Sequence, residues 1–437
     1  MTRRSAFAVL SMGLLMTALW SGPVRAAATL VDTATINSGD TAWMLTSTAL
    51  VLLMTIPGLA LFYAGMVRKK NVLGTMAHSI VTVAIVSVLW VVVGYSLAFT
   101  PGSMFLGGLD RVMLDGMMFL KEAGKLSVSP LAPTIPESVF VMYQMTFAII
   151  TPALITGAFA ERMKFSALIL FIIIWSLVVY VPIAHWVWEP GGWLATEGVL
   201  DFAGGTVVHI SAGISGLVAA LIVGPRMGYG DEPMPPHNLV LTLIGAALLW
   251  VGWFGFNAGS ALAADGRAGM AMLVTQVATA TGALGWMAAE WLRRGKPSVL
   301  GLVSGAVSGL VAITPASGFV GISGALVIGV VAGVACYLGA TVLKGWLGYD
   351  DTLDVFGIHA IGGITGSLLT AVFADKAIGG VSTTLATQAF GVGLTILYAG
   401  VATAVILMLV KMLVGLRVGS SDEVDGLDSE QHGESVS

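Results

Sequence analysis

Charged residues and cysteines are both scarce in this sequence of 437 residues. Asp, Glu, Lys and Arg make up only 10% of it, whereas 57% of the residues are hydrophobic. Because soluble domains carry about 25% charged residues, this composition excludes an ordinary soluble protein and indicates a chain that crosses a membrane many times. The single cysteine, Cys336, excludes intrachain disulfides and thiolate metal sites. A net charge of −4 gives no sign of nucleic-acid binding.

The N-terminal segment has the pattern of a signal peptide. Arg3 and Arg4 precede an apolar stretch from Ala6 to Trp20, and small residues follow around Ala26. We predict that residues 1–26 are a signal peptide cleaved near Ala26. A retained signal anchor is the alternative.

Long apolar runs follow this segment. Eleven of them are long enough to cross a bilayer, at about 42–65, 73–99, 137–159, 166–187, 204–224, 238–258, 269–291, 298–315, 320–343, 357–374 and 386–414. The sequence therefore predicts an all-α polytopic membrane protein, with a transmembrane domain over residues 40–415. The remaining tail, 416–437, is acidic and polar, and we expect it to be mobile or to become ordered only on a partner.

Basic residues are concentrated in alternate loops, which predicts the orientation. One set of loops holds Arg68, Lys69, Lys70, Arg162, Lys164, Arg226, Arg293, Arg294, Lys296, Lys344, Lys411 and Arg417. The other set holds only Arg111, Lys121, Lys125, Arg267 and Lys376. We therefore place the mature N-terminus outside and the tail in the cytoplasm.

Two histidine motifs are near repeats of each other. "GGTVVHISAGISG" at 204–216 and "DVFGIHAIGGITG" at 354–366 superpose His209 on His359, and "FYAG" at 62–65 superposes on "FNAG" at 256–259. The first pair lies in spans five and ten, the second in spans one and six. Because five spans per repeat is an odd number, the two halves must be inverted, as in many transporters, with the eleventh span outside the duplication.

The inverted repeat places both histidines near the middle of the membrane. Their helices, however, start only a few residues earlier from opposite faces. An extended chain rises up to roughly 3.3 Å per residue, so eight residues reach the midplane. We therefore predict that the segments after Asp201 and Asp351 enter the membrane before helix begins.

His209 and His359 are candidates for a substrate or proton path, because ionisable residues inside a bilayer are rare and costly. Imidazole accepts a hydrogen bond at one nitrogen and donates from the other, which suits a small neutral guest. The alternative is two packed histidines bonded to their neighbours. Asp201 is expected to cap the following helix, and its charge would also favour a nearby cation.

Trp188, in "AHWVWEPGGW", is a candidate for a cation site, because an indole face attracts an ammonium-like ion. Phe147, Phe256 and Ser260 also fall in the outer halves of their spans, where the alternative role is lining or packing. "GISG" at 213–216 and "HAIGGITG" at 359–366 imitate rhomboid-protease signatures, which would pair Ser215 with His359. "GISG" recurs at 321–324, and the duplication explains both signatures. We expect no enzymatic activity.

Several long motifs resemble the ammonium transporter family, the bacterial relatives of the Rhesus glycoproteins. The resemblance runs from about Asp40 to the C-terminus and includes "TIPGLALFYAGMVRKKNVL", "GAFAERMKFSA", "DFAGGTVVHI", "GWFGFNAGSA", "GLVAITPASGFV" and "DVFGIHAIGG". It implies a homotrimer in the bacterial inner membrane, with one pore in each subunit and no cofactor or metal. The tail resembles a segment that receives PII-type nitrogen-signalling proteins, although its acidic pattern is only partly kept.

The resemblance also implies roles for individual residues. The ammonium recruitment site of the family matches Phe147, Trp188 and Ser260. Its gate of two stacked rings matches Tyr143 and Phe256, with tyrosine in place of the phenylalanine of some relatives. The pore histidines match His209 and His359, and the aspartate that supports the recruitment site matches Asp201.

Together, the motifs and the cost of moving an ion through lipid predict a transporter that recruits ammonium outside, removes its proton and conducts ammonia past the two histidines. The fate of the proton stays open. The alternative function is an ammonium sensor that signals through its cytoplasmic tail.

Overall fold

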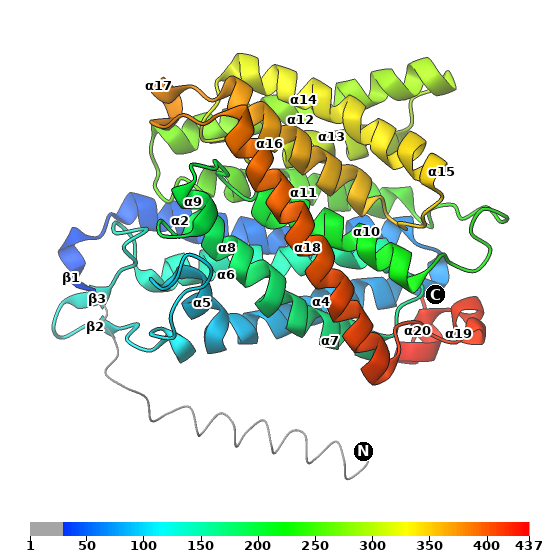
Figure 1. The fold of residues 1–437 in the computed structure, drawn as a ribbon, viewed down its shortest axis with the longest axis horizontal. Coiled ribbons are helices and arrows are strands. Elements are labelled where there is room, and N and C mark those ends of the chain that lie inside the picture. The colour runs from blue at the N-terminus through cyan, green and yellow to red at the C-terminus, as the bar shows by residue number, and fades with distance from the viewer. Residues whose placement is uncertain (1–28, 437) are drawn as a thin grey trace, which may run out of the picture.

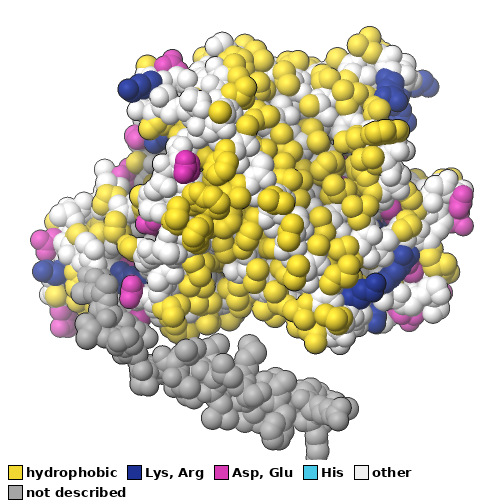
Figure 2. Space-filling model, viewed as in Figure 1, with side chains coloured by type: hydrophobic (Ala, Val, Ile, Leu, Met, Phe, Trp, Pro, Cys, Tyr) yellow, Lys and Arg dark blue, Asp and Glu magenta, His cyan; other side chains and the backbone are white. Residues whose placement is uncertain are grey.

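The computed structural model describes residues 29–436, so the predicted signal peptide lies outside the described residues. Helices of membrane length are packed side by side in one bundle (Figure 1). Hydrophobic side chains cover the middle of the face seen in Figure 2, and charged side chains gather at its two ends. This distribution matches a bundle that crosses a bilayer, and the predicted all-α polytopic class is confirmed.

Within residues 29–436, ten helical segments are long and apolar enough to span a membrane, several of them only together with a π-helical turn that adjoins the α-helix. They are formed by α2 (Ser38–Leu53) with α3 (Ala60–Met66), α4 (Val72–Leu89) with α5 (Tyr95–Phe99), α6 (Glu137–Ile155), α7 (Phe165–Trp175) with α8 (Val181–Trp188) and α9 (Trp193–Thr196), α10 (Ser211–Val223), α11 (Leu239–Gly259), α12 (Gly266–Arg294), α14 (Ile322–Tyr337) with α15 (Lys344–Leu347), α16 (Ile361–Phe373), and α18 (Leu385–Val414). The predicted span at 298–315 is the shorter helix α13 (Val299–Ile313). The remaining short helices are α17 (Lys376–Gly379), α19 (Ser420–Asp425) and α20 (Leu427–His432).

The two ends of the bundle carry different structures (Figure 1). A three-stranded antiparallel sheet in the order β1 (Leu30–Asp32), β3 (Lys125–Ser127), β2 (Phe119–Leu120) marks one end, which we call the sheet end. Within it, Val31 pairs with Leu126 and Phe119 also pairs with Leu126. Helices α19 and α20 mark the opposite end, which we call the tail end.

Both histidine motifs begin with a wide π-helical turn, Gly205–Ile210 before α10 and Phe356–Ala360 before α16. The chain is non-helical over 197–204 and 348–354, but it is bent rather than extended. Helix begins at Gly205 and Val355, before both histidines are reached, so the expected extended approach from Asp201 and Asp351 up to each histidine is wrong. Positive φ angles of 119° at Gly204 and 59° at Asp354 produce the bends. Single π-helical turns often occur at functional sites, because they change the direction of the side chains that follow.

Glycines allow the two histidine helices to cross closely. A Cβ atom on Gly213 would lie 2.2 Å from the backbone nitrogen of Ala360, and one on Gly363 would lie 2.9 Å from Ile210 Cγ1. Any larger residue at Gly213 would separate α10 from the turn that carries His359. The repeated glycines therefore bring the two histidines together.

The tail is ordered, so the expectation of a mobile tail is wrong. The carboxylate of Asp428 accepts hydrogen bonds from the backbone N–H groups of Leu73 and Gly74, at 3.0 and 2.8 Å. Glu423, 1% exposed, pairs with Arg417 at 2.7 Å and accepts from the Met227 N–H at 2.7 Å. The acidic residues of the tail thus bind unpaired N–H groups and an arginine of the same chain.

Candidate functional site

His209 and His359 face each other in the interior of the bundle. Their ring centroids are 5.4 Å apart with planes 20° apart, and their Nδ1 atoms are 3.3 Å apart. One Nδ1 must donate and the other must accept in this contact. The ring that donates then has an acceptor at Nε2, and the other has a donor there, so the pair offers one hydrogen-bond acceptor and one donor.

Apolar side chains enclose the rings in a space that we call the histidine cavity. The volume open to the centre of a water-sized molecule is about 10 Å³, which is room for roughly one water. Besides the two histidines, its lining is Met54, Leu59, Phe62, Ile150, Leu154, Val208, Leu249, Trp253, Phe256 and Val307. The Nε2 atom of His209 is buried and has no hydrogen-bond partner among residues 29–436. Only a small guest able to make hydrogen bonds fits this cavity well.

Trp253 lies in the motif "GWFGFNAGSA", but it was not predicted from the sequence to be a site residue. Its ring stacks on His209 with centroids 5.3 Å apart, and its Nε1 donates to Thr314 Oγ1 at 2.9 Å. The fixed indole packs on the His209 imidazole, and the Nδ1 edge of the same imidazole contacts His359.

A pair of phenylalanines closes the histidine cavity toward the sheet end. The rings of Phe147 and Phe256 are packed with centroids 4.3 Å apart, and both are buried. Tyr143 contacts Phe147 edge to face at 5.0 Å, and its hydroxyl donates to the Phe256 carbonyl at 2.9 Å. The expected stacking of Tyr143 on Phe256 is therefore wrong, because the tyrosine hydroxyl is bonded to the backbone of α11 and Phe147 takes the place of its ring.

Beyond this pair lies a second space, the sheet-end pocket, of about 190 Å³. Its lining is Phe99, Leu131, Phe140, Gln144, Phe147, Trp188, Phe202, Ser260 and Leu262. Three residues predicted for recruitment, Phe147, Trp188 and Ser260, thus meet in one pocket. Trp188 contacts Phe147 edge to face at 5.7 Å, and its Nε1 donates to the Asp201 carbonyl at 3.0 Å. Because the indole N–H is already bonded, only the aromatic face is available to a guest.

Asp201 caps the π-helical turn that leads to His209. Its buried carboxylate accepts from the backbone N–H groups of Gly204, Gly205, Thr206 and Val207 and from the Thr206 hydroxyl, at 2.5 to 3.2 Å. These donors are the unpaired N–H groups of a helix start. Asp201 does not line either space, so its side chain acts on the site through the helix it holds and through the bond of its carbonyl to Trp188.

Ser215 and His359 do not form a protease pair. The Ser215 hydroxyl lies 2.8 Å from Thr403 Oγ1 and accepts from the Trp175 indole at 3.0 Å. The ring of His359 is directed at His209. The geometry gives the serine a packing role.

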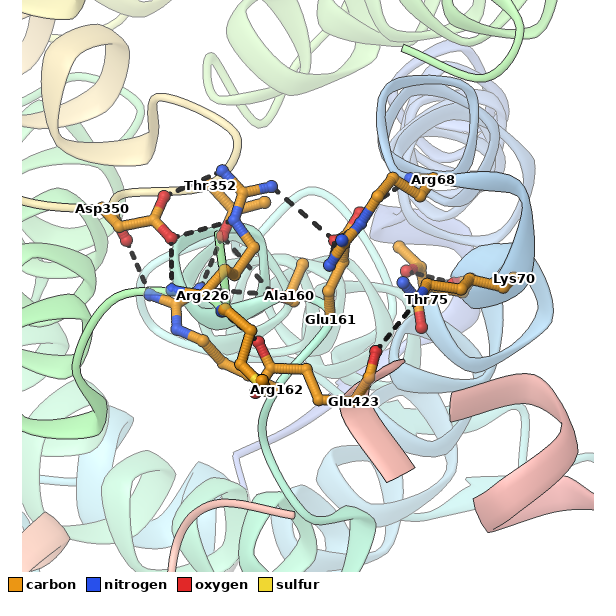
Figure 3. A network of polar contacts seen from close by, with 12 residues as sticks. Arg68, Lys70, Thr75, Ala160, Glu161, Arg162, Arg226, Asp350, Thr352 and Glu423 are labelled. Carbon is orange, nitrogen blue, oxygen red and sulfur yellow. Dashed lines mark hydrogen bonds and ion pairs between the residues drawn. The ribbon is translucent and has the colours of Figure 1, made fainter. Parts of the chain in front are cut away.

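Buried charges support the other end of the pore (Figure 3). Arg226 binds the Asp350 carboxylate through two nitrogens, at 2.8 and 2.9 Å, and lies 3.8 Å from Glu161, which Arg68 contacts at 2.6 Å. Burial alone would raise the pKa of Asp350, but the hydrogen bonds and charge of Arg226 hold it below its usual value. Arg162, fully buried, donates to the Asp350 carbonyl at 2.6 Å. The network fixes the loop that leads into the His359 turn.

Asp351, the repeat partner of Asp201, is less well satisfied. Its Oδ2 accepts from the Phe356 N–H at 2.7 Å, and its Oδ1 is buried with no hydrogen-bond partner among the described residues. Burial raises the pKa of Asp351 from 3.8 to about 6, although Lys344 opposes this. Because the folded pKa lies above the unfolded one, the folded state keeps a proton between about pH 4 and 6 that the unfolded state releases. Stability is therefore lost as the pH rises through this window.

Replacing Asp351 with asparagine should remove this pH dependence. The amide keeps an acceptor for Phe356 and carries no charge to bury, so at pH 7.5 the variant should be more stable than the wild type by roughly 3 kcal/mol, since one pKa unit is worth about 1.4 kcal/mol. At pH 4.5, where the carboxyl of the folded chain is mostly protonated, the advantage should fall to roughly 1 kcal/mol. Melting curves in detergent at both pH values measure the stability difference between the variant and the wild type. The control is Asp375→Asn, which replaces the exposed N-cap residue of α17. An advantage independent of pH would contradict the account.

Apolar membrane-length helices enclosing a narrow cavity with two facing imidazoles define a channel or transporter for a small polar solute. The Ammonium Transporter Family matches residues 42–437. An ammonium transporter of Aquifex aeolicus is 51% identical over 409 residues, 92% of this chain and 94% of the relative. The crystal structure of Candida albicans Mep2 superposes with a TM-score of 0.82 at 34% identity, covering 90% of this chain and 89% of that chain. A structure described as "Sensor Amt Protein" also gives 0.82, at 28% identity, covering 90% and 98%.

The chain belongs to the ammonium transporter family, which confirms the resemblance found in the sequence.

Proposed function

We propose that this chain transports ammonium by carrying it through the bundle as ammonia. The sheet-end pocket recruits the cation, the cation gives up its proton there to water, and ammonia passes the Phe147–Phe256 pair into the histidine cavity. The observation that carries this proposal is the pair of facing imidazoles in an apolar cavity with room for about one water.

The cost of burying charge favours the neutral species. An ion transferred into an apolar space of this size loses its hydration, and two neutral imidazoles and ten apolar residues do not replace it. Ammonia loses only hydrogen bonds, each worth about 1–3 kcal/mol. One acceptor and one donor on the histidines compensate much of that loss.

Recruitment rests on aromatic faces and one hydroxyl. A desolvated cation over a tryptophan face gains about 0.5–2 kcal/mol, and Trp188 is held in place by Asp201. Ser260 donates its hydroxyl hydrogen to the Phe256 carbonyl at 2.8 Å, so its lone pairs can accept from a guest. Potassium has no proton to give, and the proposal therefore excludes it from the histidine cavity.

The proposal includes an orientation and an assembly. We place the sheet end outside and the tail end in the cytoplasm of a bacterial inner membrane, because the arginine- and lysine-rich loops lie at the tail end. The transmembrane domain covers 40–415, the tail covers 416–437, and three copies form a homotrimer with one pore each. A PII-type nitrogen-signalling protein is the proposed partner at the tail end. Light scattering of the purified protein tests the trimer.

Reconstitution in liposomes tests transport. An ammonium gradient should produce a change in internal pH or a current with the protein present, and a potassium gradient of equal size should produce neither. A pH change without current means that the proton stays outside, and a current means that it follows separately. Vesicles that respond to both gradients, or to neither, would contradict the proposal.

The alternative is an ammonium sensor. It is favoured by the ordered tail, whose Glu423 contacts Arg417 and the Met227 N–H, and by the likeness to the structure described as a sensor. Ammonium binding without flux in the same liposomes, together with altered protease cleavage of the tail, would support the sensor.

A further inference from the structure

Gln144 is a polar side chain among the aromatic residues of α6 that line the sheet-end pocket. Phe140, Gln144 and Phe147 are spaced by four and three residues, so they lie on one face of the helix and all three line the pocket. Gln144 is only 9% exposed, and in the part of the chain that the structure describes its Oε1 atom has no hydrogen-bond partner. A buried amide oxygen without a partner loses its hydrogen bonds to water and gains none in return, which is costly.

We propose that Gln144 is a cation-binding residue of this pocket, whose amide oxygen accepts a hydrogen bond from ammonium or methylammonium. This inference rests on the proposed function and adds a specificity-determining residue to it. The last torsion of a glutamine is broad, so the amide turns its oxygen toward a guest at little cost. The bound cation then supplies the missing partner.

The composition of the pocket gives this acceptor its importance. Among the nine residues that line it, only Gln144 and Ser260 carry a side-chain oxygen, and the others are aromatic or aliphatic. The Trp188 N–H is already bonded to Asp201, so the indole contributes only its face. Two oxygen acceptors and two ring faces match four N–H groups, whereas an alkali ion requires a larger shell of oxygens.

The chemistry of an amide also suits a transport site. A carboxylate at this position would bind the cation more tightly and slow its passage. A neutral amide adds one charge-assisted hydrogen bond and no net charge. Gln144 therefore increases the affinity for cations that carry N–H groups without trapping them.

The test is methylammonium uptake into proteoliposomes by the full chain and its variants. Gln144→Met keeps the length of the side chain and removes the acceptor, so the half-saturating concentration should rise about tenfold with maximal uptake retained, the loss expected for one hydrogen bond to a charged group. Gln144→Glu keeps an oxygen and should not raise it. The control is Gln276→Met on α12, whose amide accepts from the Trp250 indole outside the pocket.

Thermal melting separates binding from folding. Because Oε1 has no partner in the folded chain, Gln144→Met should melt at or above the wild-type temperature, whereas removal of a structural hydrogen bond would lower it. An unchanged half-saturating concentration in Gln144→Met would overturn the inference. So would an equal rise in Gln144→Met and in the control Gln276→Met, accompanied by lower melting temperatures of both. A wild-type protein without any uptake would instead refute the proposed function.

Discussion

We expect the replacement of His209 with leucine to lower ammonium flux at least about a hundredfold in proteoliposomes. The substitution removes one imidazole from the histidine cavity and leaves the Nδ1 of His359 without its partner at 3.3 Å. Ammonia then crosses an almost wholly apolar space. Losing about two hydrogen bonds costs roughly 3 kcal/mol, and each 1.4 kcal/mol of barrier is a factor of ten in rate.

The matched control is His237→Leu. His237 lies in the loop before α11, where its backbone N–H donates to the Val67 carbonyl and its ring lines neither the sheet-end pocket nor the histidine cavity. This variant should transport like the wild type. Stopped-flow recording of internal pH after an ammonium jump measures both variants, and flux of His209→Leu within threefold of wild type would refute a role of the histidines in conduction.

The replacement of Asp201 with alanine should abolish transport and destabilise the fold. Four backbone N–H groups and one hydroxyl lose their acceptor in a buried place. Each unsatisfied buried group costs about 1–3 kcal/mol, so the total loss is several kcal/mol even after partial rearrangement. The turn that carries His209 and the carbonyl that holds Trp188 then both lose their position.

Asp265→Ala provides the comparison for Asp201. Asp265 caps α12 through the N–H groups of Arg267 and Ala268, at 2.9 and 3.0 Å, and it lies exposed at the surface. Its loss should cost about 1 kcal/mol and leave transport intact. Melting temperature and methylammonium uptake of the two variants test the difference. Equal effects of the two substitutions would show that Asp201 is no more than an ordinary helix cap.

Much of the histidine cavity could be predicted from the sequence, because two similar motifs carry its histidines. Two motifs with histidine and glycine at equal spacing predicted that His209 and His359 belong together, and the structure brings their rings into contact. The glycines that make this contact possible are part of the same motifs. A repeated pattern specifies long-range contacts that a single motif cannot specify.

The order of the aromatic rings could not be predicted in the same way. Tyr143 and Phe147 are four residues apart on α6, so the sequence places both on one face and does not say which ring meets Phe256. The tyrosine hydroxyl decides it, because it bonds to carbonyl oxygens of α11. The hydrogen bonds of the buried Tyr143 hydroxyl therefore determine that Phe147, and not Tyr143, packs against Phe256.

The order of the tail and the role of Gln144 in the sheet-end pocket could not be predicted from the sequence either. An acidic, polar composition predicted disorder for the tail, but its order depends on N–H groups of α4 and on Arg417. Gln144 likewise looks unremarkable among the apolar residues of its span. Its position becomes informative only when other helices close the pocket around it.

Parallel uptake of methylammonium and rubidium into proteoliposomes of the wild-type chain tests most directly whether the charge is removed before the cavity is crossed. Rubidium is a cation of ammonium's size that carries no proton. The account predicts saturable methylammonium uptake, with rubidium uptake no faster than into vesicles without protein. Rubidium uptake at a rate comparable to that of methylammonium would contradict it.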